Sequence, residues 1–225
     1  MLQLIQPPSW FYEVNACIDL FSALVLLVIA GASYRYYRLF KIERHYADLA
    51  LAYGSLAVAF VLKVYAHAVT RIPVSSAGSM FVYIEELQER ALLLHSLFIL
   101  YMFFFLVGLY LLYAILHKQP RVNYIVVPML LAAVSYMAIM HYFIYQAVVL
   151  LFFAILAVSY WNRYQANANK TTAYLALSFI LLVSSAVLFF IAGVWGMFYV
   201  VAESVQLLGF IGLLLTFVSV FHGKK

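Results

Sequence analysis

Seven stretches of about 17 to 25 predominantly apolar residues fill most of this 225-residue chain, and they limit its possible folds more than any other feature. Each is long enough to cross the ~30 Å hydrocarbon core of a bilayer as a helix, which makes its backbone hydrogen bonds internally. Composition agrees, because 68% of the residues are hydrophobic and 9% are charged, whereas soluble domains have about 25% charged residues. The sequence predicts an all-α, polytopic membrane protein, a seven-transmembrane-helix bundle.

The predicted spans cover residues 11–34, 47–70, 89–116, 122–140, 142–161, 172–194 and 198–221. A short outer tail (1–10) precedes this transmembrane domain (11–221), and a basic cytoplasmic tail (222–225) follows it. The fourth and fifth spans are separated by almost no polar sequence. One helix of about forty residues would nevertheless be twice as long as one crossing requires, so we expect two spans there.

Basic residues are distributed unevenly between the two sets of connections. Ten of the thirteen fall on one side, namely Arg35, Arg38, Lys41, Arg44, Lys118, Arg121, Arg163, Lys170, Lys224 and Lys225. Cytoplasmic loops carry such an excess. We therefore predict a multi-pass cell-membrane protein with its N-terminus outside and its C-terminus in the cytoplasm. Attraction to anionic lipid at the inner leaflet accounts for the net charge of +5 without a nucleic-acid partner.

A short motif, AxLAL, opens both the second span (Ala47–Leu51) and the sixth (Ala173–Leu177). Carried forward, this match sets Glu89 of the third span against Glu203 of the seventh. It suggests a 3+1+3 parallel repeat in which the fourth span links two three-helix units. Binding sites of repeat-built membrane proteins tend to lie between the units. The alternative is a chance match, because apolar spans are built from few residue types and such short matches are frequent in them.

Polar residues inside the spans are costly in lipid, so they tend to face the bundle interior and to find partners. The candidate ligand-binding residues are Asp19, Lys63, His67, His95, Glu203 and Gln206. Counted from the predicted ends of their helices, all six lie in the outer half of the membrane. We therefore expect a polar pocket that opens to the outside above an apolar floor.

Lys63 and His67 are four residues apart and share one face of the second span. If this face points inward, Lys63 pairs with Asp19 or Glu203. Alternatively, Lys63 extends its ammonium group toward the lipid headgroups.

Three functions fit this pattern. The first is a receptor- or sensor-like module that signals through a cytoplasmic or membrane partner or as a homo-oligomer. The second is a small-solute or proton-coupled ion transporter, in which buried acids and histidines carry protons. The third is a subunit that binds a b-type haem or a metal, with weak candidate ligands in His67, His95, His141 and Glu203. No cofactor is required by the sequence, and no catalytic constellation is evident, so an enzyme is not expected.

Overall fold

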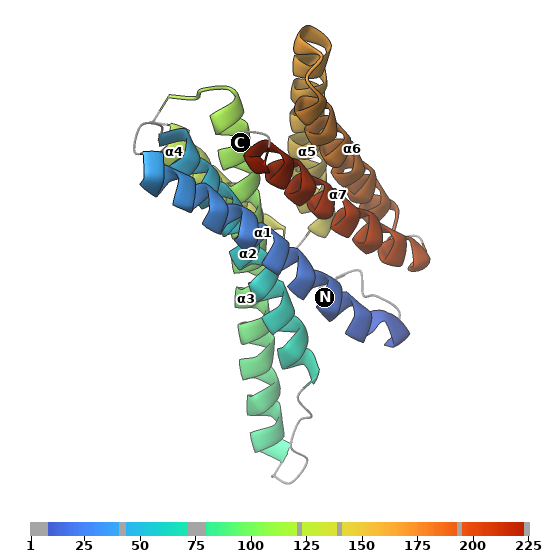
Figure 1. Ribbon diagram of the computed structural model, residues 1–225. Coiled ribbons are helices and arrows are strands. Elements are labelled where there is room, and N and C mark those ends of the chain that lie inside the picture. Colours follow the sequence, from blue (N-terminus) through green and yellow to red (C-terminus); the bar gives the residue numbers. More distant parts are fainter. Residues whose placement is uncertain are drawn as a thin grey trace.

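The computed structural model describes residues 9–40, 44–71, 80–120, 123–138, 141–192 and 195–222, and these ranges form a bundle of helices (Figure 1). A single 3-10 turn, η1 (Ser9–Phe11), leads into the first helix. The α-helices are α1 (Tyr12–Phe40), α2 (Arg44–Arg71), α3 (Met80–Leu116), α4 (Asn123–Met137), α5 (Tyr142–Asn167), α6 (Lys170–Ile191) and α7 (Met197–His222). All but α4 are long and apolar enough to cross a membrane. The predicted helical membrane bundle is confirmed.

Several boundaries differ from the sequence prediction. α1 and α5 extend to Phe40 and Asn167, beyond the predicted spans, and two further differences concern α3 and α4. α3 begins at Met80 rather than near residue 89, because the last helix breakers before it are Pro73 and Gly78 and good helix formers follow. α4 has only 15 residues, which corresponds to about 22 Å and is shorter than the ~30 Å hydrocarbon core. It also contains Pro128, which removes one backbone hydrogen bond from the helix.

Side-chain contacts give the relative direction of α3 and α5. The rings of Tyr101 and Tyr145 lie 6.0 Å apart, and Tyr113 and Phe152 lie 6.3 Å apart farther along both helices. At the end of α3, Nη2 of Arg163 donates a 2.8 Å hydrogen bond to the Leu116 carbonyl. The two helices are therefore parallel, so α4 must return the chain to the end of the bundle at which α3 began. This agrees with the prediction that spans four and five are separate helices.

The helices pack as two sequential triplets, α1–α2–α3 and α5–α6–α7, which meet where α1 lies beside α7 and α3 lies beside α5 (Figure 1). Both triplets use the same close approach of helices. A methyl group on Gly108 of α3 would lie 2.6 Å from Leu56 of α2, and one on Gly209 of α7 would lie 2.8 Å from Leu182 of α6. Leu56 and Leu182 each stand nine residues after the first alanine of an AxLAL motif.

Two similar three-helix units would produce these contacts. However, equating Gly108 with Gly209 aligns α3 and α7 in a different register from the match of Glu89 with Glu203. Moreover, the side chain of Glu89 lies outside the described residues. The 3+1+3 repeat therefore stays a prediction. Its α2–α6 alignment agrees with the glycine contacts, and its α3–α7 alignment does not.

Substitution of Gly108 by alanine should destabilise the bundle by about 1–3 kcal/mol, because the added methyl group meets both Leu56 and the Ala52 carbonyl oxygen, at 2.6 and 3.0 Å. Thermal unfolding in detergent measures the loss. Gly54→Ala is the matched control, since a methyl group there meets nothing within 4 Å, and it should be neutral or stabilising. Equal melting temperatures for the two variants would contradict this packing.

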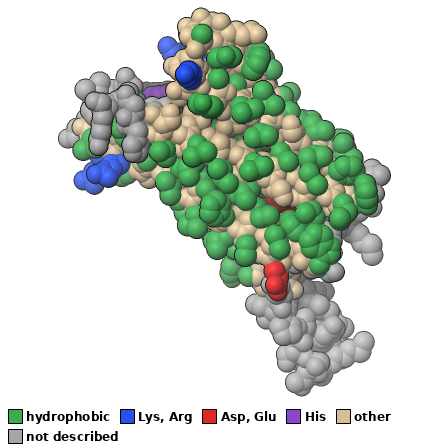
Figure 2. All heavy atoms as spheres, turned by 45° about the vertical axis from the view of Figure 1, so that its right-hand side comes forward, with side chains coloured by type: hydrophobic (Ala, Val, Ile, Leu, Met, Phe, Trp, Pro, Cys, Tyr) green, Lys and Arg blue, Asp and Glu red, His purple; other side chains and the backbone are tan. Residues whose placement is uncertain are grey.

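The outer surface of the bundle is apolar on every helix that it exposes. On the face drawn in Figure 2, hydrophobic side chains cover the middle of the molecule. Exposed examples from all seven helices are Leu20, Leu51, Leu92, Met129, Leu151, Leu177 and Leu208. Such a surface contacts lipid in a multi-pass membrane protein. Five exposed basic residues lie near the ends of α1 and α5, just after α3 or at the start of α6, namely Arg35, Arg38, Arg163, Lys118 and Lys170. This distribution agrees with the predicted orientation but does not show it.

Candidate functional site, a buried charge cluster between α1, α2 and α7

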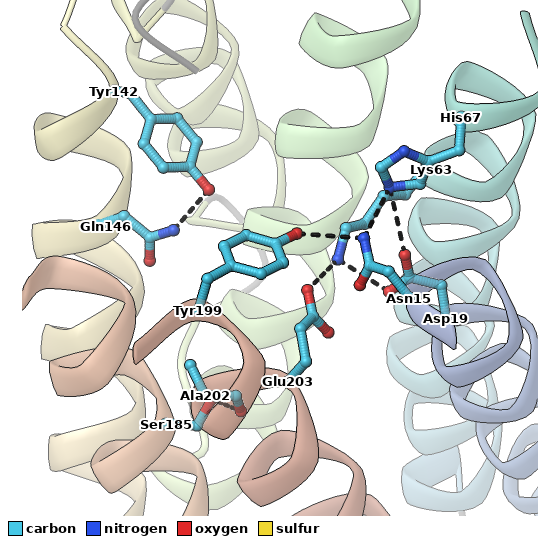
Figure 3. A network of polar contacts seen from close by, with 10 residues as sticks. All are labelled: Asn15, Asp19, Lys63, His67, Tyr142, Gln146, Ser185, Tyr199, Ala202 and Glu203. Carbon is cyan, nitrogen blue, oxygen red and sulfur yellow. Dashed lines mark hydrogen bonds and ion pairs between the residues drawn. The ribbon is translucent and has the colours of Figure 1, made fainter. Parts of the chain in front are cut away.

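Three ionisable side chains from three helices meet inside the bundle. Nζ of Lys63 on α2 lies 2.8 Å from Oδ1 of Asp19 on α1 and 2.7 Å from Oε1 of Glu203 on α7 (Figure 3). Asp19 is 0%, Glu203 1% and Lys63 8% exposed. We call these residues the charge cluster. Of the two orientations considered for Lys63, inward pairing is therefore the correct one, and it uses both predicted partners.

A second layer of polar residues lies one helical turn nearer the end of the bundle. Nδ2 of Asn15 lies 3.2 Å from Nε2 of His67 and donates to the Tyr199 hydroxyl at 3.3 Å. The same Nε2 lies 3.5 Å from Oδ2 of Asp19, so His67 connects the two layers. Each helix supplies one residue to each layer at i, i+4 spacing, which places both on one helical face (Figure 3).

Apolar side chains close the charge cluster on its inner side. The Phe60 ring lies beneath Lys63, with its centroid 5.8 Å from Nζ. Phe60 in turn packs edge-on against Phe105 and Phe210, at centroid distances of 5.9 and 5.3 Å. All three phenylalanines are at most 1% exposed. An apolar layer therefore lies beneath the cluster, and the pocket for which the sequence predicts such a floor stays a prediction.

A smaller apolar group covers the cluster on the side where α1 and α7 begin. It comprises Phe11, Phe189, Ala192, Tyr199 and Ala202. The Tyr199 ring lies between Phe11 and Phe189, at 6.5 and 5.3 Å. His67, whose side chain is 14% exposed, is the most accessible of the residues that contact the cluster. The described residues thus cover most of the cluster, and the predicted pocket that opens to the outside stays a prediction.

The charges and hydrogen bonds of the cluster do not balance. One ammonium faces two carboxylates, so with a neutral His67 the net charge is −1. Three buried acceptor atoms have no hydrogen-bond partner among the described residues, namely Asn15 Oδ1, Asp19 Oδ2 and Glu203 Oε2. Buried polar atoms are normally hydrogen-bonded, and a buried charge is normally paired. The cluster therefore has spare capacity to accept a proton or a hydrogen-bond donor.

The structure does not bring the remaining predicted residues into the cluster. Nδ1 of His95 bonds to the Ala91 carbonyl of its own helix, and His141 is exposed just before α5. Gln206 is 6% exposed one turn farther along α7. Within the described part of the chain, no three metal-ligating side chains form a group that holds an ion. His67, His95, His141 and Glu203 are thus not gathered around one point.

Two residues of the site, Asn15 and Tyr199, were not among the sequence candidates. Both carry a detectable signal, because Asn15 precedes Asp19 by four residues and Tyr199 precedes Glu203 by four. The i, i+4 reasoning used for Lys63 and His67 applies equally to these pairs. Burying a neutral amide or phenol in lipid costs less free energy than burying a charge, so its presence in an apolar span is a weaker indication of a site.

Fold and site together define a multi-pass helical membrane protein whose first, second and last helices are joined by a buried charge cluster. Comparisons with protein-family models, curated proteins and solved structures find no match to this chain.

Proposed function

We propose that this chain is a receptor- or sensor-like membrane module, and that the charge cluster is the site at which it responds to a ligand. The observation that carries the proposal is the charge imbalance of a cluster whose residues are 0–8% exposed. Lys63 holds one oxygen of each carboxylate, while Glu203 Oε2 and Asn15 Oδ1 remain without partners in the described chain. A ligand that supplies a positive charge or a donor there changes the strength of the α1–α2–α7 connection.

The position of the cluster allows such a change to spread through the bundle. Asp19 and Lys63 belong to the first helix triplet and Glu203 to the second, so Lys63 ties the two triplets together where α1 meets α7. Weakening the Lys63–Glu203 contact favours a shift of one triplet against the other. Helix shifts of about 1–2 Å are a common form of signal transmission. A partner chain at the basic end of the bundle would then receive the signal.

The sensor proposal predicts that neutralising Glu203 alone moves α7 relative to α1. Glu203→Gln imitates a ligand-neutralised carboxylate, and spin labels at Leu39→Cys and Leu215→Cys, both lipid-facing, report the distance between the far halves of these helices. The native Cys17 is replaced by serine to leave two label sites. We expect the mean distance in lipid to change by about 1–2 Å or more. Glu13→Gln, which removes an exposed acid near the start of α1, should leave it unchanged, and an unchanged distance in Glu203→Gln would contradict the proposal.

A transporter is the second candidate, and one observation favours it. The charge cluster lies between the two helix triplets, where transporters built from repeats bind their substrates. Against it, α1, α2 and α7 are continuous past the cluster, whereas such transporters usually interrupt these helices. A pH-sensitive dye inside vesicles separates the two functions. Proton entry that exceeds that of protein-free vesicles and is lost in Glu203→Gln would favour transport over sensing.

A further inference from the structure

Nε2 of His67 lies between two groups that require opposite protonation states of this nitrogen. The Asn15 amide nitrogen is a donor, so its 3.2 Å contact with Nε2 requires Nε2 to be unprotonated. Oδ2 of Asp19 is an acceptor, so its 3.5 Å contact with the same Nε2 requires this nitrogen to carry a proton, and the contact is an ion pair when both ring nitrogens are protonated. The site therefore offers Nε2 a partner in both states.

The charge of the cluster favours the protonated state. With neutral His67, one ammonium and two carboxylates leave a net charge of −1 among residues that are 0–8% exposed. An uncompensated buried charge is costly. With an imidazolium at His67, two positive groups face two negative ones. The extra ion pair uses Oδ2 of Asp19, which otherwise has no hydrogen bond in the described chain.

We infer that the cluster binds one exchangeable proton, held on Nε2 of His67 between Asn15 and Asp19, and that this proton is the ligand of the proposed sensor. The proton comes from solvent, and one N–H bond forms on the imidazole. Half a turn of the Asn15 amide then presents Oδ1, which has no partner among the described residues, to this N–H, and Nδ2 exchanges its contact with the Tyr199 hydroxyl for the former position of Oδ1. The inference rests on the proposed function, because it names the ligand of the same site.

A metal ion fits the cluster less well than a proton does. Lys63 already holds one oxygen of each carboxylate, at 2.8 and 2.7 Å. A cation bridging both acids would therefore lie close to the ammonium, and the repulsion between the two positive charges is strong where water is excluded. Among the described residues, three acceptor atoms of the cluster region are without a hydrogen-bond partner, whereas Ca²⁺ takes about six to eight oxygen ligands.

The titratable groups near His67 fall into two sets. One set keeps its charge state over about pH 5–8, namely Lys63 on α2, Tyr101 on α3, Tyr142 on α5 and Tyr199 on α7. Asp19 on α1 and Glu203 on α7 are acids that compete with His67 for a proton. Tyrosine and lysine ordinarily lose their protons about three units or more above histidine. Within about pH 5–8, protonation of this site therefore involves His67 or one of the two acids.

The test follows the ring nitrogens of isotope-labelled histidine by solid-state NMR, with the full-length protein in lipid vesicles, as the pH is lowered from about 8 to 5. We expect one histidine signal, absent in His67→Gln, to change from neutral imidazole to imidazolium. Glu203→Gln removes the excess negative charge, so it should move this midpoint to lower pH by about one unit or more. Glu13→Gln, an exposed acid on the same helix as Asp19, should leave it in place.

Three results would overturn the inference. The first is a His67 signal that stays neutral, or whose midpoint is the same in Glu203→Gln. The second is an infrared band of a protonated carboxylic acid that is lost in Glu203→Gln while His67 stays neutral, which would put the proton on the acid. The third is a midpoint that shifts when sodium replaces choline, which would show competition by a metal cation.

Failure of the inference can be told apart from failure of the proposed function. If His67 titrates as expected and the α1–α7 distance in Glu203→Gln is unchanged, the proton site stands and the sensor proposal fails. If that distance changes and His67 does not titrate, the sensor proposal stands and its ligand is not a proton.

Discussion

Replacing Lys63 by methionine should cost the protein about 3–5 kcal/mol of stability, the range typical for removal of one partner from a buried ion pair. The variant leaves Asp19 and Glu203, 0% and 1% exposed, without the ammonium that contacts both. Methionine is of similar length, so the loss reports charge rather than volume. Unfolding of the native protein and the variant by a denaturing detergent, followed by circular dichroism, measures the difference in the free energy of unfolding.

A compensated variant separates charge from packing. In Lys63→Met combined with Asp19→Asn and Glu203→Gln, no charge remains in the cluster, and most of the lost stability should return, because replacing a whole buried ion-pair network is often close to neutral. Lys118→Met, an exposed lysine after α3, should change stability by less than about 0.5 kcal/mol. If Lys63→Met were as stable as Lys118→Met, the cluster would not hold charged groups in the arrangement described.

The pH dependence of the single variant has a definite sign. Without Lys63, two neighbouring carboxylates are buried together, and the folded state gains most by taking up protons. Stability rises as pH falls wherever the folded state binds more protons than the unfolded state. The deficit of Lys63→Met should therefore be largest at high pH and should shrink as the solution is acidified. The compensated variant should show no such dependence.

The positions of most helices along the chain could be predicted from the sequence, because lipid imposes one strong constraint on the backbone. Long apolar runs must be helical, and this places six helices without reference to any packing detail. This constraint is weaker at helix ends that lie in water or at the membrane interface. There the backbone can bond to water, and the local sequence decides between helix and loop. That explains why α3 begins at Met80 within a segment expected to be an outer connection, and why α4 is shorter than its apolar run.

The contacts of Lys63 could also be predicted, since helix direction and depth put Asp19 and Glu203 at its level. The enclosure of the cluster could not. Phe11, the last residue of η1, and Tyr199, in the first turn of α7, reach over it, and this depends on the tilt and rotation of α1 and α7. Likewise, His95 has the right depth but bonds to the Ala91 carbonyl. Sequence gives the depth of a side chain and leaves open which partner it prefers.

Phe60→Ala should produce the second large loss of stability, about 3 kcal/mol. This is the lower end of the range for phenylalanine truncation in a core, because in lipid the loss comes from packing rather than from transfer out of water. Phe60 is 1% exposed and packs edge-on against Phe105 and Phe210. Phe21→Ala, which truncates a 49% exposed phenylalanine on α1, is the matched control. Equal losses in the two variants would show that Phe60 does not hold these helices together.

The same truncation should alter the chemistry of the cluster above it. Phe60 separates Lys63 from the apolar interior, with 5.8 Å between Nζ and the ring centroid. A cavity in its place, bordered by a charged group, can admit water, and water raises the local dielectric constant and weakens every charge–charge interaction nearby. The effect of Glu203→Gln on the His67 midpoint should therefore be smaller in a Phe60→Ala background than in the native one. An undiminished effect would mean that enclosure by Phe60 does not set the strength of these interactions.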